Sequence, residues 1–570
     1  MDLLLVLLIG VVAIAVVTAL AQKLGVAGPL LLVGLGLVVG WLPFVHVGEP
    51  EPDIILIGVL PPLLYSAAVN LPAIEFRRDF RPIAGLSVML VVFSALVLGV
   101  FFWLAIPAVG LPLGIALGAI LSPTDAVATS IAKRLGIAPR VVTMLEGESL
   151  LNDATALVLL RTAIVAIAGS FSLWGAIGTF AWGVLIAVVI GALVAAVLLR
   201  LREWVGSSAA NTAISFTVPF LAYLPTERLG GSGLVAAVVA GIITGQGAAR
   251  RLTPEQRLSD TLNWRTIELV LEGAVFLLMG LELKDIVTAN FADHEGLWYP
   301  LWLALVALVI IVAVRALYVT YLVWLQGRRA KRYDRDRLLA LEKRIEDGDV
   351  GPRGRVPKNP EAYQRNMDGL RTRVQRMLAD ADYYRSSPLG WKHGAVIVWA
   401  GMRGVVTLAA AQTLTAAQTA DHRALLVFIA FLVALVSLML QGFTLPWLVR
   451  VLRFAPPASD DESELGDRLG DELAEAGAKA LTDPSLTMRN GDPFPAGVLE
   501  RMRERSVTRN EDTAAMTRVI GELRLIMIDA QRVRLLELGH DGTFSSAELR
   551  HALAELDAEQ LSLELRLADD

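Results

Sequence analysis

SPTDAVATSIAKRLGIAPRVVTMLEGESLLNDATALV, residues 122–158, places ionisable side chains inside a long hydrophobic region. An aspartate at the centre of a membrane-spanning helix costs about 2.5 to 3.5 kcal/mol on insertion scales, so such a group indicates function by default. We therefore predict that this segment holds a cation and a proton in competition. Its polar side chains are those of Asp125, Glu146, Glu148, Asn152 and Asp153.

Composition and hydropathy place the chain in a membrane. Hydrophobic residues make up 55% of its 570 residues, whereas soluble domains contain about 45 to 50%. The excess lies before residue 455, in runs long enough to cross a hydrocarbon core. This pattern predicts an all-α polytopic membrane protein with about 13 transmembrane helices. The expected spans are roughly 2–21, 26–45, 53–70, 82–107, 111–134, 141–168, 172–200, 208–224, 231–248, 267–283, 297–326, 390–414 and 422–452.

Loop charges set the expected orientation in the lipid. Most lysines and arginines fall in alternate loops, whereas the opposite loops carry only Arg228, Lys284 and Arg423. By the positive-inside rule, the N-terminus lies outside and the C-terminal tail lies in the cytoplasm. The first run has no basic region before it and no cleavage site, so we expect a first span and not a removed signal peptide. The expected location is the prokaryotic plasma (inner) membrane.

Charge also divides the chain into domains. Residues 455–570 hold 25 acidic and 13 basic residues, and the whole chain has a net charge of −5. We expect a transmembrane domain over 1–454 and an acidic cytoplasmic tail, helical in 495–567, that could make regulatory contacts. A polar cytoplasmic insertion over 327–389 is expected to form two short amphipathic helices. The segment DGTFSSAEL, 541–549, lacks a ligand of a calcium loop, so we interpret it as a helix–turn–helix.

The absence of cysteine and of basic clusters narrows the function classes. The chain has no cysteine, which excludes disulfides, thiolate metal sites and cysteine catalysis. No basic cluster in the tail indicates nucleic acid, so no nucleic-acid partner is expected.

Pro123 is expected to interrupt the fifth span. Proline inside a helix removes a backbone hydrogen bond and frees a carbonyl, and irregular backbone at membrane depth is tolerated where it lines a cavity or is buried in protein. Ser122, Asp125 and Thr129 are spaced to share one helix face. We expect hydroxyl, carboxylate and carbonyl oxygens to meet here, which suits a hard cation. The alternative is a proline kink with a satisfied polar face.

The sixth span offers a second face of oxygen ligands. Glu146, Ser149 and Asp153 follow the same spacing, and Glu148 and Asn152 form a neighbouring pair. A cation bound at a carboxylate opposes protonation of that group. Mutually exclusive occupancy is the physical basis of exchange.

Arg403 lies in the twelfth span between Gly401 and Gly404, which predicts a second interruption. Paired interrupted helices in corresponding halves indicate a transporter site built from inverted repeats. A charged arginine at this depth needs a partner. For Arg161 and Arg315, which also lie within spans, we expect structural pairing or snorkelling.

SPTDAVAT, EGESLLNDATALV and GMRGVVTLAAA together resemble the sodium/proton antiporters of the monovalent cation/proton antiporter-1 group. The resemblance covers residues 1–454. It implies an inverted-repeat antiporter fold with two interrupted helices, and a homodimer whose core bundles move elevator-like against a dimerisation domain. It also implies a secondary transporter that exchanges Na⁺, or Li⁺ or K⁺, for H⁺ without a cofactor.

The motif match assigns roles to five residues of the central segment. It implies that Asp153 is the ion-binding aspartate and that Asn152 is its neighbour in an Asn-Asp pair. Asp125, Ser149 and the Thr124 carbonyl then complete a Na⁺ site with Asp153. The Asn-Asp pair is associated in this group with electroneutral exchange.

The resemblance implies further roles outside the ion ligands. Glu148 is expected to form a structural ion pair with Arg403. Ser66 stands near a position where some relatives carry an acidic residue, so it is a candidate for the wall of the site. Ser122 and Glu146 are further candidates for that wall.

Two other functions remain open from the residues alone. Two intramembrane aspartates also occur in aspartyl proteases, but such enzymes resemble one another in a Gly-x-Gly-Asp motif that neither Asp125 nor Asp153 carries. A monovalent cation channel usually repeats one pore-lining segment around an axis, and the sequence shows no such repeat. The oxygen ligands do not distinguish among Na⁺, K⁺ and Li⁺.

Overall fold

The computed structural model describes most of the chain up to residue 454. The chain divides into two compact units, Met1–Ala455 and Pro456–Asp570. All regular secondary structure of the described residues is helical. Most of the tail, including 541–549, lies outside the described residues, and those described between 525 and 567 are helical. The described ranges are 3–24, 26–42, 53–106, 108–125, 127–167, 173–292, 297–330, 335–346, 388–419 and 422–454, with separate positions within 367–384 and 525–567.

Five helices of the described residues are long and apolar enough to cross a membrane: Phe80–Ala105, Pro139–Ile167, Ile177–Trp204, Trp298–Arg328 and Arg423–Leu452. Shorter apolar helices accompany them. The prediction of an all-helical membrane protein with several apolar spans is confirmed. The shorter helices are Leu8–Ala21, Gly28–Gly40, Ile54–Val69, Leu111–Leu121 and Gly233–Ala248.

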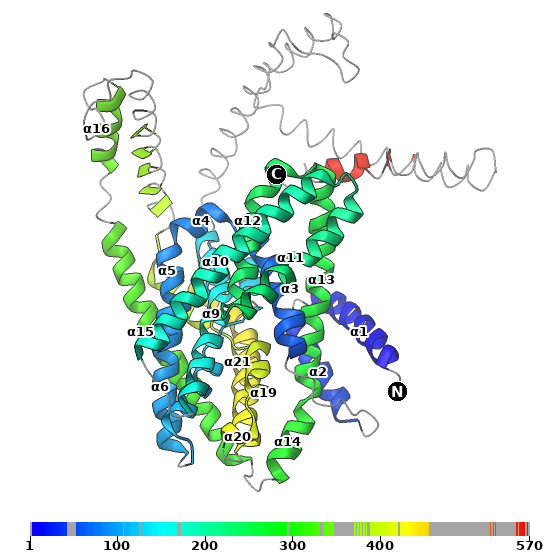
Figure 1. Ribbon diagram of the computed structural model, residues 1–570, viewed down its shortest axis with the longest axis vertical. Helices are drawn as coiled ribbons and strands as arrows, with labels where there is room; N and C mark the ends of the chain where they lie inside the picture. The colour runs from blue at the N-terminus through cyan, green and yellow to red at the C-terminus, as the bar shows by residue number, and fades with distance from the viewer. Residues whose placement is uncertain are drawn as a thin grey trace, which may run out of the picture. The chain divides into compact units, whose positions relative to one another are not determined.

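One group of helices, here called the core bundle, carries the central segment (Figure 1). Within it α6 packs on α7, α7 on α9, and α15 on both α6 and α21. Apolar side chains such as Leu98, Phe102 and Phe431 are fully buried between these helices. The bundle consists of α6 (Leu90–Ala105), α7 (Leu111–Leu121), α8 (Val127–Arg134), α9 (Pro139–Ile167), α15 (Trp298–Ala330), α18 (Trp391–Trp399), α19 (Val405–Gln412) and α21 (Arg423–Leu452).

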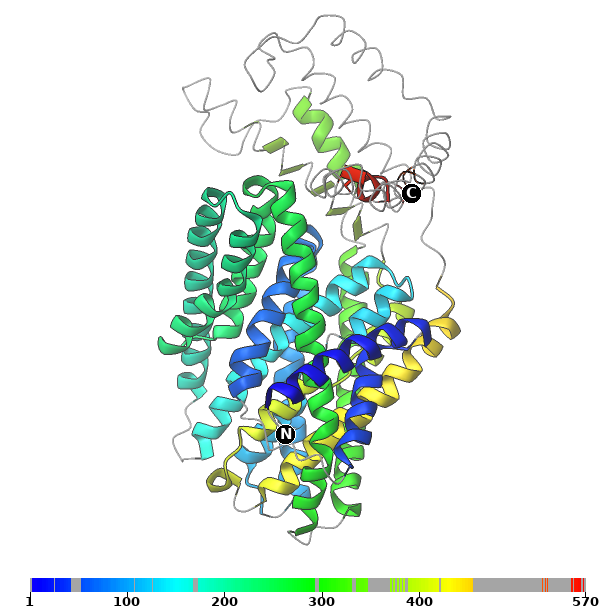
Figure 2. The same cartoon turned by 90° about the vertical axis from the view of Figure 1, so that its right-hand side faces the viewer.

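In a second group, here called the scaffold bundle, the helices α3 and α10 to α13 share a small hydrophobic cluster around Tyr65, Val218 and Trp264. Helix α1 crosses α13 obliquely (Figure 2). Gly36 and Gly280 let α2 and α13 touch, since a side chain at either would meet the opposite backbone. The bundle consists of α1 (Leu3–Leu24), α2 (Gly28–Gly40), α3 (Leu60–Val69), α10 (Leu173–Trp204), α11 (Ser208–Arg228), α12 (Gly233–Arg251) and α13 (Pro254–Leu281).

Helix α13 begins thirteen residues before the expected span 267–283, at Pro254. A capping box sets this start, because Thr253 Oγ1 accepts from Gln256 N and Gln256 Oε1 accepts from Thr253 N. The first three turns are polar, so hydropathy alone does not detect them. The remaining elements are η1 (Ile54–Val59), α4 (Ala73–Arg78), α5 (Phe80–Ala84), η2 (Gly85–Met89), α14 (Leu283–Ala292), α16 (Arg335–Glu346) and α20 (Ala416–Thr419).

The described residues of the insertion form two helical arms, which together are here called the hairpin. Its first arm is α16, and the described positions between 367 and 384 are also helical. Ile345, Val374 and Leu378 form a small core between the two arms. These apolar side chains connect the two arms of the hairpin.

The end of the hairpin docks beside the start of α9. Arg140, in the first turn of α9, donates to both carboxylate oxygens of Asp79 at 2.8 Å. Tyr383 donates to Asp79 Oδ2 at 3.1 Å, and Tyr384 donates to Arg78 O at 2.8 Å. Arg78 also pairs with Asp380 at 2.7 Å. The hairpin is therefore fastened to the helix that carries the central carboxylates.

Candidate cation-binding site

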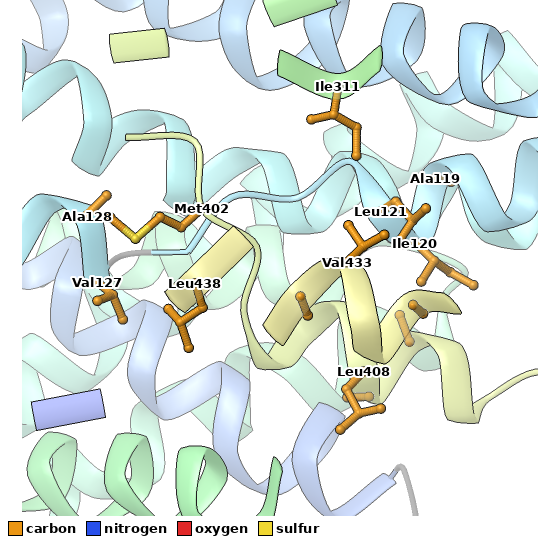
Figure 3. Close-up of a cluster of buried hydrophobic side chains, with 14 of the residues drawn as sticks. Ala119, Ile120, Leu121, Val127, Ala128, Ile311, Met402, Leu408, Val433 and Leu438 are labelled. Atoms are coloured by element: carbon orange, nitrogen blue, oxygen red, sulfur yellow. The ribbon is translucent and has the colours of Figure 1, made fainter. Parts of the chain in front are cut away.

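The two predicted interruptions face each other inside the core bundle. Helix α7 ends at Leu121 and α8 begins at Val127, while α18 ends at Trp399 and α19 begins at Val405. Figure 3 shows the extended segments of both interruptions, with buried side chains such as Met402 around them. Asp125 N donates to Met402 O at 2.8 Å. This hydrogen bond joins the two interruptions directly.

Asp125 lies where two helices begin. Its Oδ1 accepts from Val127 N at 3.3 Å, at the start of α8. Its carboxylate also lies against Gly404, the N-cap of α19, where a Cβ atom would overlap it. Helix N-termini carry partial positive charge, so both α8 and α19 favour a negative charge at this point.

Arg403 satisfies carbonyls that the interruptions set free. Its Nε donates to Leu121 O at 3.0 Å and its Nη1 donates to Gly401 O. Its backbone N donates to Ser437 Oγ at 3.0 Å. The guanidinium thus ties the end of α7 to the break after α18.

The expected ion pair between Glu148 and Arg403 is wrong. Glu148 pairs with Arg315 of α15, whose Nη2 donates to Glu148 Oε2 at 2.8 Å and whose Nη1 donates to Oε1. Arg315 Nε also donates to Ile397 O at 2.9 Å. Arg403 does not pair with Glu148 because its guanidinium is bound to backbone carbonyls. The expectation of structural pairing for Arg315 is confirmed, as it is for Arg161, which pairs with Glu227 at 2.9 Å.

Asn152 holds the interrupted segment in place. Its Nδ2 donates to Thr124 Oγ1 at 2.6 Å and lies 3.4 Å from Thr124 O. Thr124 Oγ1 in turn donates to Glu148 Oε1 at 3.3 Å. Asn152 is buried and does not line the neighbouring cavity. Its side chain therefore orients Thr124, the residue whose carbonyl is expected to bind the ion.

A cavity of about 310 Å³ lies between the core and scaffold bundles. Thr124, Asp125, Ser149 and Asp153 all line it. Asp153 is only 6% exposed. The structure thus brings all four predicted Na⁺ ligands to one cavity, where carboxylate, hydroxyl and carbonyl oxygens are the donor types that hard cations prefer.

Of the other three candidates for the wall of the site, only Glu146 lines the cavity. Glu146 lines the cavity and pairs with Lys133, which also lines it. Ser122 Oγ donates to Gly118 O at 2.7 Å, so it turns back onto its own helix and away from the cavity. The expected face shared with Asp125 is lost because the helix is interrupted between them. Ser66 is buried outside the cavity lining, and its hydroxyl has no partner among the described residues.

Several oxygen-bearing side chains of the cavity were not predicted from the sequence, among them two glutamates and a threonine. Glu268 and Glu272 line it from α13, and Thr407 lines it from α19. The spacing of the two glutamates within an apolar run was a usable signal, since acidic residues in a span indicate function by default. Thr407 is uncharged, so its place in an apolar span does not by itself indicate function.

The sodium/hydrogen exchanger transmembrane family matches residues 10–451 of this chain. The chain belongs to this family. An uncharacterized Na⁺/H⁺ exchanger of Escherichia coli K12 is 36% identical over 277 residues, which cover 47% of this chain and 50% of the relative. Another, from Mycobacterium bovis, is 26% identical over 568 residues, covering 97% of this chain and 95% of the relative.

A solved structure shares the fold. The sodium proton antiporter MjNhaP1 from Methanocaldococcus jannaschii superposes with a TM-score of 0.56 at 18% identity, covering 79% of this chain and 99% of that chain. Family membership makes this chain a sodium/proton antiporter, a secondary transporter and not an enzyme. The resemblance stated from the three motifs is confirmed, and the channel and protease alternatives are set aside.

Proposed function

We propose that this chain exchanges Na⁺ for H⁺ at Asp125 and Asp153, one for one, across the prokaryotic plasma membrane. The observation that carries the proposal is that both carboxylates line one cavity with Ser149 and Thr124, at the meeting point of two interrupted helices. A dehydrated cation needs several oxygen ligands, and these four residues supply them. A proton at Asp153 removes the charge that holds the cation, so the two occupants alternate.

The ion reaches either side when the core bundle moves against the scaffold bundle. Two observations support this mechanism. The cavity lies between the bundles, with walls from α3 and α13 on one side and from α8, α9 and α19 on the other. Part of the scaffold bundle, on α3 and α10 to α13, also has a hydrophobic cluster of its own. Two interrupted helices that cross at the site are typical of transporters built from inverted repeats.

The topology follows the loop charges. About 13 spans place the N-terminus outside and the tail over 455–570 in the cytoplasm. Lys133 and Glu146 line the cavity beside the turn between α8 and α9, where Arg134 and Arg140 are the flanking basic residues; this supports a cavity that opens towards the cytoplasm. Two copies of the chain associate through their scaffold bundles within the lipid.

The named substrates of a relative support transport of small monovalent cations by this chain. A Bacillus pumilus protein that is 32% identical over 279 residues is a sodium, potassium, lithium and rubidium/H⁺ antiporter; these residues cover 47% of this chain and 41% of the relative. We place Na⁺ first for this chain and keep Li⁺ and K⁺ as further substrates. The mechanism is the same for all three, because the ligands are oxygens in each case.

Charge counting supports electroneutral exchange. Asn152 is neutral, so Asp125 and Asp153 are the titratable members of the four-residue site. If the pair carries one cation in one direction and one proton in the other, no net charge crosses the membrane. An imposed membrane potential then changes neither the rate nor the end point.

Purified protein in liposomes with an internal pH dye tests the proposal. Pulses of NaCl, LiCl and KCl should each be compared with empty liposomes, with and without a potassium/valinomycin clamp. We expect a Na⁺ pulse to move protons and the clamp to have no effect. Absence of cation-dependent proton movement would refute antiport, and a response to the imposed potential would refute one-for-one exchange.

A further inference from the structure

The α13 wall of the cavity carries two carboxylates that the proposed exchange does not use. Glu268 and Glu272 lie four residues apart on α13, so they share one face, and both line the cavity. Both are half-buried. Neither makes a hydrogen bond or ion pair with another described residue. These carboxylates are therefore available to a ligand within the cavity.

Thr407 provides an independent sign that this wall binds a ligand. Its side chain is fully buried and lines the same cavity from α19. Its Oγ1 has no hydrogen-bond partner among the described residues. A buried hydroxyl without a partner costs free energy. Because α19 packs on α13, the hydroxyl and the two carboxylates belong to adjoining walls.

The charge of the cavity identifies the ligand as a cation. Lys133 is the one basic side chain among the described residues of the lining, and it pairs with Glu146. The remaining charged groups of the lining are carboxylates. A cleft lined by one sign of charge raises the local concentration of the opposite ion.

We propose that Glu268, Glu272 and the Thr407 hydroxyl form a second binding site for a monovalent cation, here called the vestibule site. This inference rests on the proposed function, because the ion passes from the vestibule site to Asp125 and Asp153. Hard oxygen ligands suit the same cations at both places. Glu268 lies about 6 Å along the helix axis from Glu272, nearer the start of α13, so the carboxylates form a stepwise path inward.

The vestibule site joins two bundles. Its carboxylates belong to the scaffold bundle and its hydroxyl belongs to the core bundle. The full set of ligands is therefore present only while α19 lies beside α13. Movement of the core bundle separates Thr407 from the glutamates and leaves the cation with Asp125 and Asp153.

Transport kinetics of the full chain in liposomes test this assignment. We expect Glu272→Gln to raise the Na⁺ concentration for half-maximal exchange about threefold or more, with the maximal rate unchanged. Thr407→Val keeps the shape of the side chain and removes the hydroxyl. It should also raise the Na⁺ concentration for half-maximal exchange. Glu272→Asp should restore most of the affinity. The control is Glu255→Gln, which removes an exposed carboxylate from the same helix outside the cavity.

Equilibrium binding of radioactive ²²Na⁺ to solubilised protein separates this inference from the proposed function. In an Asp153→Asn background we expect weak binding that the double change Glu268→Gln/Glu272→Gln removes. This readout needs no exchange, so it reports on the vestibule site even if antiport fails. Unchanged half-saturation together with unchanged binding in the double variant would overturn the proposal. A fall in maximal rate at constant affinity and constant binding would also overturn it.

Discussion

Glu148 on α9 and Arg315 on α15 form a two-point ion pair, with 2.8 Å between Glu148 Oε2 and Arg315 Nη2. Both side chains are 2% exposed. Removing one partner leaves a buried charge without compensation, at a cost of about 3 to 5 kcal/mol. We therefore expect Arg315→Gln to lower the melting temperature of the solubilised protein strongly.

The matched controls are a double variant and an exposed pair. Glu148→Gln/Arg315→Gln removes both charges and should recover part of the lost stability. Arg161→Gln breaks the exposed pair with Glu227, so its effect should stay within about 1 kcal/mol. Equal melting temperatures for Arg315→Gln and Arg161→Gln would show that the buried pair contributes no more to stability than the exposed pair.

Gly404 allows the Asp125 carboxylate to lie against the start of α19. We expect Gly404→Ala to abolish exchange, because its Cβ would overlap that carboxylate and displace it from the cavity. Gly34→Ala is the control, since nothing lies within 4 Å of a Cβ at this position. Exchange at the parental rate in Gly404→Ala would contradict this close approach between the Asp125 carboxylate and α19.

Asn152 is expected to act by positioning Thr124. Asn152→Ala removes a buried hydrogen bond of 2.6 Å, which is worth about 0.5 to 1.5 kcal/mol. The larger effect should be a rise in the half-saturating Na⁺ concentration, because the Thr124 carbonyl is no longer held. A variant with parental affinity and a lower melting temperature would assign Asn152 a purely structural role.

The hairpin contact predicts a response to alkaline pH. Burial and the neighbouring Asp79 carboxylate raise the pKa of Tyr383. The folded state then holds a proton that the unfolded state loses above the ordinary value of 10.0, so stability from this group is present below that pH and falls above it. Tyr383→Phe should lower the melting temperature at pH 8 and flatten its decline at higher pH. Tyr321→Phe, at an exposed position on α15, should do neither.

The interruptions could be predicted because their cause is local. Pro123 removes a helix hydrogen bond wherever it lies, and Gly401 and Gly404 permit a break in any packing. The partner of Glu148 could not be predicted in this way. Arg315 and Arg403 both lie in apolar spans and carry the same charge. Only the three-dimensional position of the Arg315 side chain, which reaches Glu148 from α15, and the carbonyls around Arg403 decide between them.

The α13 wall shows a second limit of sequence reasoning. Hydropathy detects the apolar part of a span, so it places the start of this helix at residue 267 and leaves Glu268 at its edge. The structure begins the helix at Pro254, which puts Glu268 and Glu272 well inside it. Which helix faces the cavity depends on contacts between distant segments, and no local pattern contains that information.

Proton movement by Asp153→Asn in liposomes tests the central claim most directly. The amide is nearly isosteric with the carboxylate but cannot carry charge or titrate, and an unchanged elution profile and melting curve would show that the fold persists. Asp285→Asn, at an exposed position on α14, is the matched control. We predict Na⁺-dependent proton movement in the parent and in Asp285→Asn, and none in Asp153→Asn. Parental exchange by a folded Asp153→Asn protein would contradict the claim that cation and proton compete for this carboxylate.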